Sequence, residues 1–136
     1  MAEHPNVARV RRAEEVRDRG TFEPEDIAIL EDYLDENVVW HGRGAWAQDI
    51  VGRDNVIEMM KGFKAATGGT LKLTIGDIYA DERHAVVMCR LQAQRNGKTL
   101  DVMEVNLFHL NDQVRVTEFW GIPADGDAID SFWAEG

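Results

Sequence analysis

The stretch that decides the fold runs from Ala85 to Leu110 and reads AVVMCRLQAQRNGKTLDVMEVNLFHL. Parts of Ala85–Gln94 and of Leu100–Leu110 alternate apolar with polar residues, and this two-residue period predicts two β-strands. Asn96-Gly97 lies between them, and this dipeptide is a strong signal for a tight β-hairpin turn. The stretch therefore predicts a pair of antiparallel strands.

The same period continues on both sides of this pair. Leu71, Leu73 and Ile75 alternate with polar residues before it, and Val114–Trp120 predicts a final strand after it. Polar turn residues separate the segments. We therefore expect a meander of about four antiparallel strands.

Upstream of the meander the apolar residues recur at helical spacing, which predicts three helices with one short strand between the second and the third. Gly20 suits a left-handed helix C-cap, and Pro24 suits a first helical turn. Together this order predicts an α+β domain in which helices cover one face of a curved sheet. The helices are expected at about Asn6–Arg19, at Pro24–Leu34 and from a cap at Asp54 or Asn55 to Gly68-Gly69, the strand at Val38–His41, and a short closing helical turn at Ala128–Trp133.

Length and composition narrow the class of protein. The 136 residues, 44% hydrophobic and 29% charged, predict one folded domain over residues 1–136. A net charge of −10 opposes nucleic-acid binding, and no apolar run reaches the roughly 20 residues of a membrane span. The first residues have no cationic start and no apolar core, so we expect no secretory signal, and the single cysteine, Cys89, suits a reducing cytoplasm. Five arginines gather near the N-terminus, where we interpret them as a solvated helix face rather than a contact for an anionic partner: Arg9, Arg11, Arg12, Arg17 and Arg19.

An ordered set of short motifs resembles the SnoaL-like, ketosteroid-isomerase-like group, also called the nuclear-transport-factor-2-like (NTF2-like) superfamily. The resemblance covers about Val7 to Trp133. The Gly-Arg-Asp start of the third helix and the aromatic end of the last strand are its most specific parts. Its motifs are Val10-Arg11-Arg12 through Asp18-Arg19-Gly20, Tyr33 through His41, Ile50 through Val56, Asp101 through Phe108, and Glu118-Phe119-Trp120.

The resemblance implies a cystatin-like or NTF2-like cone, in which a curved, mostly antiparallel sheet wraps around the N-terminal helices and a deep apolar cavity. It also implies a homodimer formed through the open face of the sheet. When the pattern of ketosteroid isomerases is laid on this chain, the general base falls on His41 and the oxyanion-hole acid on Glu104. The place of their oxyanion-hole tyrosine falls on Ala13, so steroid isomerisation by that mechanism is not expected.

His41 and Glu104 are the predicted catalytic residues. An imidazole exchanges protons near neutral pH, although a histidine at a strand end can also be purely structural. Strand alternation places Glu104 with Val102, Asn106 and Phe108 on one face, and a cavity on that face would desolvate the carboxyl group and favour its protonated form. The alternative is that this face is solvated and that the opposite one forms the core.

Six further residues are predicted to bind the ligand. Trp120 offers a flat apolar wall, and Glu118 is interpreted either as a second carboxylate for proton transfer or as an ion-pair partner of Arg90 or Arg115. Trp46 is a candidate lid. The predicted ligand-binding set is Trp40, Met60, Phe63, Asn106, Glu118 and Trp120.

The sequence thus predicts a cytoplasmic enzyme that acts without a cofactor on a hydrophobic, carbonyl-bearing small molecule by acid–base chemistry, as an isomerase, a cyclase or a hydratase. The alternative is a non-catalytic ligand-binding or dimerisation module with the same fold. The four histidines show no paired spacing and there is no phosphate-binding glycine motif, so we expect neither a metal nor a nucleotide.

Overall fold

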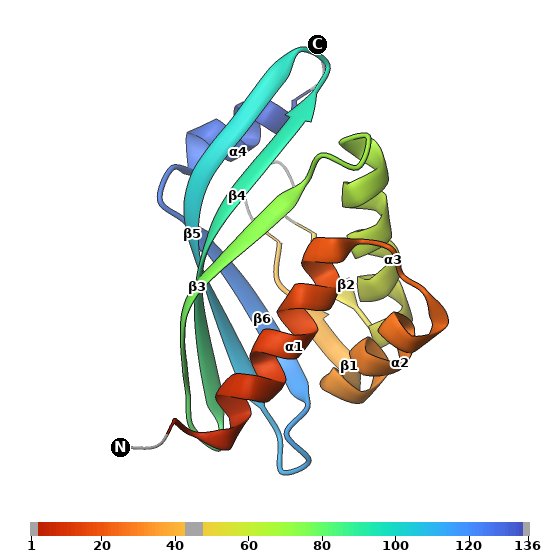
Figure 1. The fold of residues 1–136 in the computed structure, drawn as a ribbon, viewed down its shortest axis with the longest axis vertical. Helices are drawn as coiled ribbons and strands as arrows, with labels where there is room; N and C mark the ends of the chain where they lie inside the picture. The colour runs from red at the N-terminus through yellow and green to blue at the C-terminus, as the bar shows by residue number, and fades with distance from the viewer. Residues whose placement is uncertain (1–2, 43–47, 135–136) are drawn as a thin grey trace.

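The computed structural model describes residues 3–42 and 48–134, so the predicted lid residue Trp46 lies outside the described residues. Four helices and six strands form within these ranges (Figure 1). None of the helices there is long and apolar enough to span a bilayer. In chain order the elements are α1 (Pro5–Arg19), α2 (Pro24–Tyr33), β1 (Leu34–Trp40), β2 (Ile50–Val51), α3 (Arg53–Ala66), β3 (Lys72–Ala80), β4 (His84–Arg95), β5 (Lys98–Leu110), β6 (Val116–Pro123) and α4 (Gly126–Trp133).

The six strands form one mixed sheet in the order β2-β1-β6-β5-β4-β3. The strands from β3 to β6 pair antiparallel with their sequence neighbours, which confirms the predicted meander. Strand β1 joins this meander by pairing parallel to β6, with Trp40 opposite Phe119. The short strand β2 was not predicted, because two residues cannot show an alternating pattern.

Local signals set most of the turns. Gly20 ends α1 with a φ of 65°, in the left-handed region, which glycine adopts without steric cost because it has no Cβ atom. Asn96 and Gly97 both have positive φ, 52° and 75°, as a tight hairpin turn requires. Pro24 opens α2, where Glu23 and Asp26 form a reciprocal capping box.

The start of α3 differs from the prediction. The helix begins at Arg53 with Gly52 in the N-cap position, and it has no side-chain cap. The prediction that Asp54 or Asn55 caps this helix is therefore wrong. Asn55 lies inside the first turn, and its side-chain amide donates a hydrogen bond to the carbonyl of Val51 instead, at 2.9 Å.

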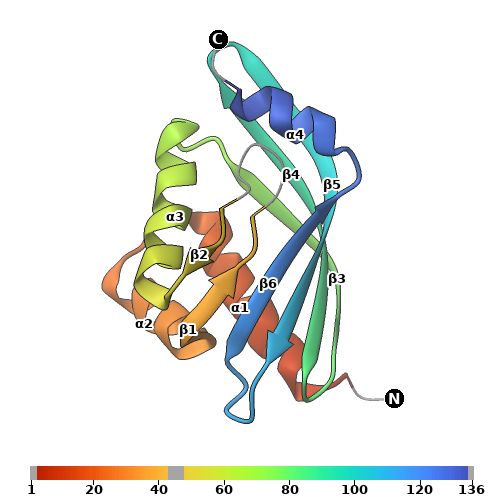
Figure 2. The same cartoon turned by 180° about the vertical axis from the view of Figure 1, so that it is seen from behind.

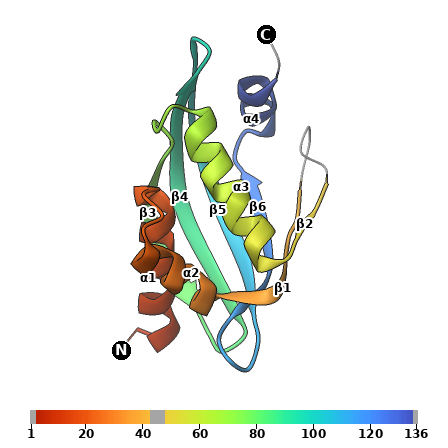
Figure 3. The same cartoon turned by 90° about the vertical axis from the view of Figure 1, so that its right-hand side faces the viewer.

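The helices α1, α2 and α3 lie on one side of the curved sheet, and the largest core cluster fills the space between them (Figures 2 and 3). The predicted alternation of β5 decides which sheet face is inside. Asn106 and Phe108 are fully buried beneath the helices, whereas Met103 is 51% exposed on the outer face. Glu104 shares the inner face, so the alternative in which this face is solvated is wrong.

Helix α4 covers the end of the sheet next to the β4–β5 hairpin (Figure 2). Its Phe132 is buried in a second, smaller core cluster with Leu100 and Val102 of β5. The hairpin also holds the C-terminal end of this helix. Arg95 donates to the carbonyl of Phe132 at 3.2 Å, and Lys98 donates to the carbonyl of Ser131 at 3.0 Å.

Candidate functional site

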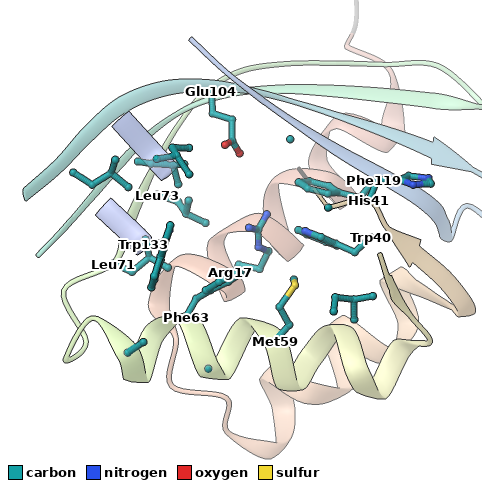
Figure 4. A pocket seen from close by; sticks show the side chains of 18 of the residues that line it. Arg17, Trp40, His41, Met59, Phe63, Leu71, Leu73, Glu104, Phe119 and Trp133 are labelled. Carbon is teal, nitrogen blue, oxygen red and sulfur yellow. The ribbon is translucent and has the colours of Figure 1, made fainter. Parts of the chain in front are cut away.

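A cavity of about 780 Å³ lies between α3, α4 and the inner face of the sheet. Its wall is mainly apolar, which is typical of small-molecule sites. Figure 4 shows the side chains around it. The lining residues are Arg17, Trp40, His41, Gly42, Gln48, Ile50, Met59, Gly62, Phe63, Ala66, Leu71, Leu73, Leu91, Leu100, Glu104, Phe119, Gly121, Ile129 and Trp133.

Helix α3 presents one face to the cavity. Met59, Gly62, Phe63 and Ala66 follow the spacing i, i+3, i+4, i+7 and therefore share one stripe of the helix. A Cβ atom on Gly62 would meet no atom within 4 Å, so this glycine borders open space. Met60 is one residue out of step with the stripe and packs in the core at 6% exposure.

Glu104 brings an ionisable group to this apolar wall. It lies on β5 opposite Cys89 of β4 and Pro123 of β6, and its carboxylate points into the cavity (Figure 4). Gly121 on the adjacent strand leaves the room that the carboxylate occupies. A Cβ atom at position 121 would come within 3.2 Å of Glu104 Oε1.

Arg17 reaches into the same cavity from α1, and its guanidinium points toward Glu104 (Figure 4). Its Nη1 donates to Glu14 Oε2 at 2.7 Å. Its Cζ lies 5.0 Å from the ring centroid of Trp40, which stacks on Phe119 with the centroids 3.4 Å apart. Burial disfavours the charged guanidinium, but the neighbouring carboxylates Glu14 and Glu104 outweigh it and keep the pKa of Arg17 above its ordinary value.

Further buried polar groups lie near Arg17. Burial raises the pKa of Glu14, although the charge of Arg17 opposes the shift. The Tyr33 hydroxyl and Asn106 Oδ1 are buried and have no hydrogen-bond partner within the described part of the chain. Asn106 Nδ2 donates to Cys89 Sγ at 3.5 Å, and burial raises the pKa of this thiol to about 12. Cys89 is thus a buried thiol.

His41 stands at the edge of the cavity, where its ring lies beyond Phe119 (Figure 4). The ring stacks on Trp120 at a centroid distance of 4.7 Å. Its Nε2 lies 2.8 Å from Glu118 Oε2, and its Nδ1 lies 3.2 Å from Asp49 Oδ2. Carboxylates at both ring nitrogens fix the orientation of the imidazole, and the Trp120 side of the ring borders a second hollow of about 520 Å³.

The structure thus separates the predicted site residues into two groups. Glu104, Trp40 and Phe63 surround the cavity, with His41 at its edge. The other predicted ligand-binding residues do not line this cavity: Met60 and Asn106 are buried in the interior, Trp120 lines the second hollow, and Glu118 contacts His41.

The prediction that Glu118 forms an ion pair with Arg90 or Arg115 is wrong. Its carboxylate contacts His41, and its Oε1 lies 3.6 Å from His109 Nδ1. The two arginines proposed for it are engaged elsewhere, because Arg90 pairs with Asp101 and Arg115 lies 3.9 Å from Asp32.

The sequence interpretation missed Glu14 and Arg17, because Arg17 was counted among the solvated arginines. A signal was present. Positions 10, 13, 14 and 17 form the i, i+3, i+4, i+7 pattern of one helix face, so both residues extend the buried stripe that begins with Val10 and Ala13. A charged pair on a buried stripe indicates an internal contact.

Among residues 3–42 and 48–134, no group of three or more His, Cys, Asp and Glu side chains is arranged to hold a metal ion.

Comparisons with known proteins agree with this architecture. The model of the SnoaL-like domain family matches residues 10–119. The chain is 34% identical over 96 residues to the uncharacterized protein Rv0034 of Mycobacterium tuberculosis, which covers 68% of this chain and 71% of that protein.

Two solved structures share the fold. Bal32a, from a soil-derived mobile gene cassette, superposes with a TM-score of 0.75 at 29% identity, over 93% of this chain and 99% of that chain. A putative SnoaL-like polyketide cyclase from Jannaschia sp. CCS1 superposes with a TM-score of 0.71 at 16% identity, over 100% of this chain and 99% of that chain.

Proposed function

The chain belongs to the family of SnoaL-like domains, and we propose that it is an enzyme that performs cofactor-independent acid–base chemistry on a hydrophobic, carbonyl-bearing small molecule. The observation that carries the proposal is the carboxylate of Glu104 in the wall of a largely apolar cavity of about 780 Å³. An apolar cavity favours hydrophobic ligands, and one carboxyl group in it supplies a proton donor or acceptor.

Glu104 moves a proton to or from a carbon atom of the ligand in this proposal. His41, at the edge of the cavity, is the second acid–base residue, with its ring held by Glu118 and Asp49. General acid–base assistance is worth roughly 10²–10⁴-fold in rate. The neighbour named as a putative polyketide cyclase supports the reaction class, because cyclisation of a polyketide involves carbonyl groups.

Occupation of the cavity is tested first with 2-acetylnaphthalene, a flat aromatic ketone, by isothermal titration calorimetry. Gly62→Leu places a side chain in the open space beside α3 and should abolish binding, whereas Gly62→Ala should weaken it less. Both variants should remain folded, because replacing a mid-helix glycine raises helix propensity. Equal affinity for wild type and Gly62→Leu would place the ligand elsewhere.

Proton transfer is tested with the same ketone in D₂O by the loss of its methyl ¹H signal. Wild type should accelerate the exchange above buffer, and Glu104→Gln should lower the rate by at least tenfold. His41→Ala should also lose at least tenfold, and an unchanged rate would remove His41 from the mechanism. Binding without any exchange would favour the alternative, a non-catalytic ligand-binding module. That alternative is supported by Ala13, which is buried in the core where the resemblance expects a tyrosine.

We also propose a cytoplasmic homodimer formed through the outer face of the sheet. This face carries an exposed large apolar side chain on each of the four neighbouring strands β3 to β6: Tyr79 at 61%, Met88 at 39%, Met103 at 51% and Ile122 at 54%. Such side chains are typical of contact surfaces. Met103→Glu should convert the dimer to a monomer in sedimentation velocity runs, and a wild-type monomer at micromolar concentration would contradict the proposal.

A further inference from the structure

Arg17 is the cationic group in the described wall of this cavity, and the proposed chemistry has not used it so far. We propose that Arg17 binds the oxygen atom of the ligand, and that Glu14 positions it for this task. The inference rests on the proposed function, because it concerns a ligand in the same cavity. It assigns to an arginine of α1 the oxygen-binding role that the family resemblance implies for Glu104.

Asn106 does not reach the ligand space. It is 1% exposed, it does not line the cavity, and its amide nitrogen is directed to Cys89 Sγ. A ligand oxygen in the cavity therefore needs another donor. Arg17 offers one, since a guanidinium carries five N–H groups and, among the described residues, its hydrogen bond to a side chain uses only Nη1, on Glu14.

The surroundings of Arg17 hold the guanidinium in a fixed orientation. Glu14 is one helical turn away at 1% exposure and accepts at 2.7 Å, so the ion pair is shielded from water. On another side the guanidinium lies against the stacked rings of Trp40 and Phe119, at 5.0 and 5.8 Å from their centroids. A donor held in advance in this way loses little conformational freedom when a ligand binds.

The charges select the kind of oxygen. Glu14 and Glu104 place two carboxylates around one guanidinium, so a fully charged carboxylate on the ligand would add a third negative group. A neutral carbonyl oxygen avoids this repulsion and still accepts a charge-assisted hydrogen bond. The ligand class that fits is a flat apolar ketone or aldehyde, with its oxygen at Arg17 and the neighbouring carbon toward Glu104.

The inference is tested with two ligands of nearly equal shape, 2-acetylnaphthalene and 2-ethylnaphthalene, of which only the first has an oxygen. Calorimetry at pH 5 measures both affinities for wild type, Arg17→Met and the double variant Glu14→Gln/Arg17→Met. The double variant removes the buried carboxylate together with its partner, so it keeps the test valid if Arg17→Met unfolds. Arg12→Met is the matched control, because Arg12 is exposed on the same helix.

Wild type and Arg12→Met should bind the ketone about tenfold or more tightly than the hydrocarbon, as expected for a hydrogen bond to a charged group. The variants without Arg17 should bind both ligands equally, with an affinity for 2-ethylnaphthalene within about threefold of wild type. A wild type without preference, or a preference that survives the loss of Arg17, would overturn the role of Arg17 and leave the proposed function standing. If wild type binds neither ligand, the cavity does not take flat apolar molecules, and the proposed function fails together with this inference.

Discussion

Replacing Arg17 with methionine tests how far the buried Glu14 depends on this one guanidinium. Glu14 is 1% exposed, and Arg17 Nη1 lies 2.7 Å from its Oε2. In the variant a carboxylate without this partner remains in the interior. Removal of one member of a buried ion pair typically costs about 3–5 kcal/mol for this reason.

The size of the stability loss in Arg17→Met is limited because Glu14 can bind a proton and become neutral. Without Arg17 its pKa rises further, so the folded variant keeps the carboxyl neutral while the unfolded chain ionises at the ordinary value of 4.5. Stability then falls as the pH rises above 4.5, and at pH 7 the 2.5 pH units set an upper limit of about 3.4 kcal/mol on this loss. At pH 5 the same cost is about 0.7 kcal/mol. Loss of the contact with Trp40 adds about 0.5–2 kcal/mol at either pH.

Urea unfolding at pH 5 and pH 7 measures this dependence. We expect Arg17→Met to lose clearly more stability relative to wild type at pH 7 than at pH 5, by up to about 2.7 kcal/mol. The double variant Glu14→Gln/Arg17→Met is the control, and its loss should be the same at both pH values. An equal loss for the single variant at pH 5 and pH 7 would refute the reasoning, since Glu14 would then not depend on Arg17 for its charge.

Three further predictions concern other buried or paired groups. Tyr33→Phe removes a buried hydroxyl that has no hydrogen-bond partner among the described residues, so we expect unchanged stability or a gain of up to about 1 kcal/mol in urea unfolding. A loss of more than about 1 kcal/mol would contradict this expectation. Cys89, with its pKa raised to about 12, should react with Ellman's reagent at pH 8 only after unfolding, and rapid reaction of the native protein would show an accessible thiol. The pKa of Asp26 is held below 3.8 by hydrogen bonds from the Thr21 hydroxyl and then Arg19, so its stabilising effect is present above pH 3.8 and is lost as the pH falls below it. Asp26→Asn should therefore flatten the acid side of the stability profile, and an unaltered profile would count against the pairing.

The sequence predicted the parts of the fold that depend on neighbouring residues. The Asn96-Gly97 hairpin, the Gly20 cap and the alternation of β5 are local signals, and the structure confirms each of them. The parallel pairing of β1 with β6 is not local. It stacks Trp40 on Phe119, and no sequence pattern within β1 or within β6 predicts that contact.

The candidate site was predicted less completely, for two physical reasons. Consecutive residues of a helix point about 100° apart, so an error of one residue changes the face of the helix. Met60 was predicted to line the cavity, but it is Met59 that does so, and Met60 is buried in the core. Charged residues are mostly exposed, and for this reason Arg17 was interpreted as solvated. Its burial depends on Glu14 and on aromatic rings that are distant in the sequence. The position of Glu104 in the cavity wall was predicted correctly, because a strand, unlike a helix, has only two faces to choose between.

The place of α4 in the chain bears on the order in which the molecule is completed during synthesis. The larger core cluster draws its members from Val7 to Phe119, so it can form as soon as β6 has left the ribosome. Ile129 and Trp133 of α4, which close one end of the cavity, emerge after it. Arg95 and Lys98 of the β4–β5 hairpin donate hydrogen bonds to the carbonyl oxygens of α4 once this helix packs. The sheet and the larger core cluster thus do not depend on α4, whereas the cavity needs this helix to close one end.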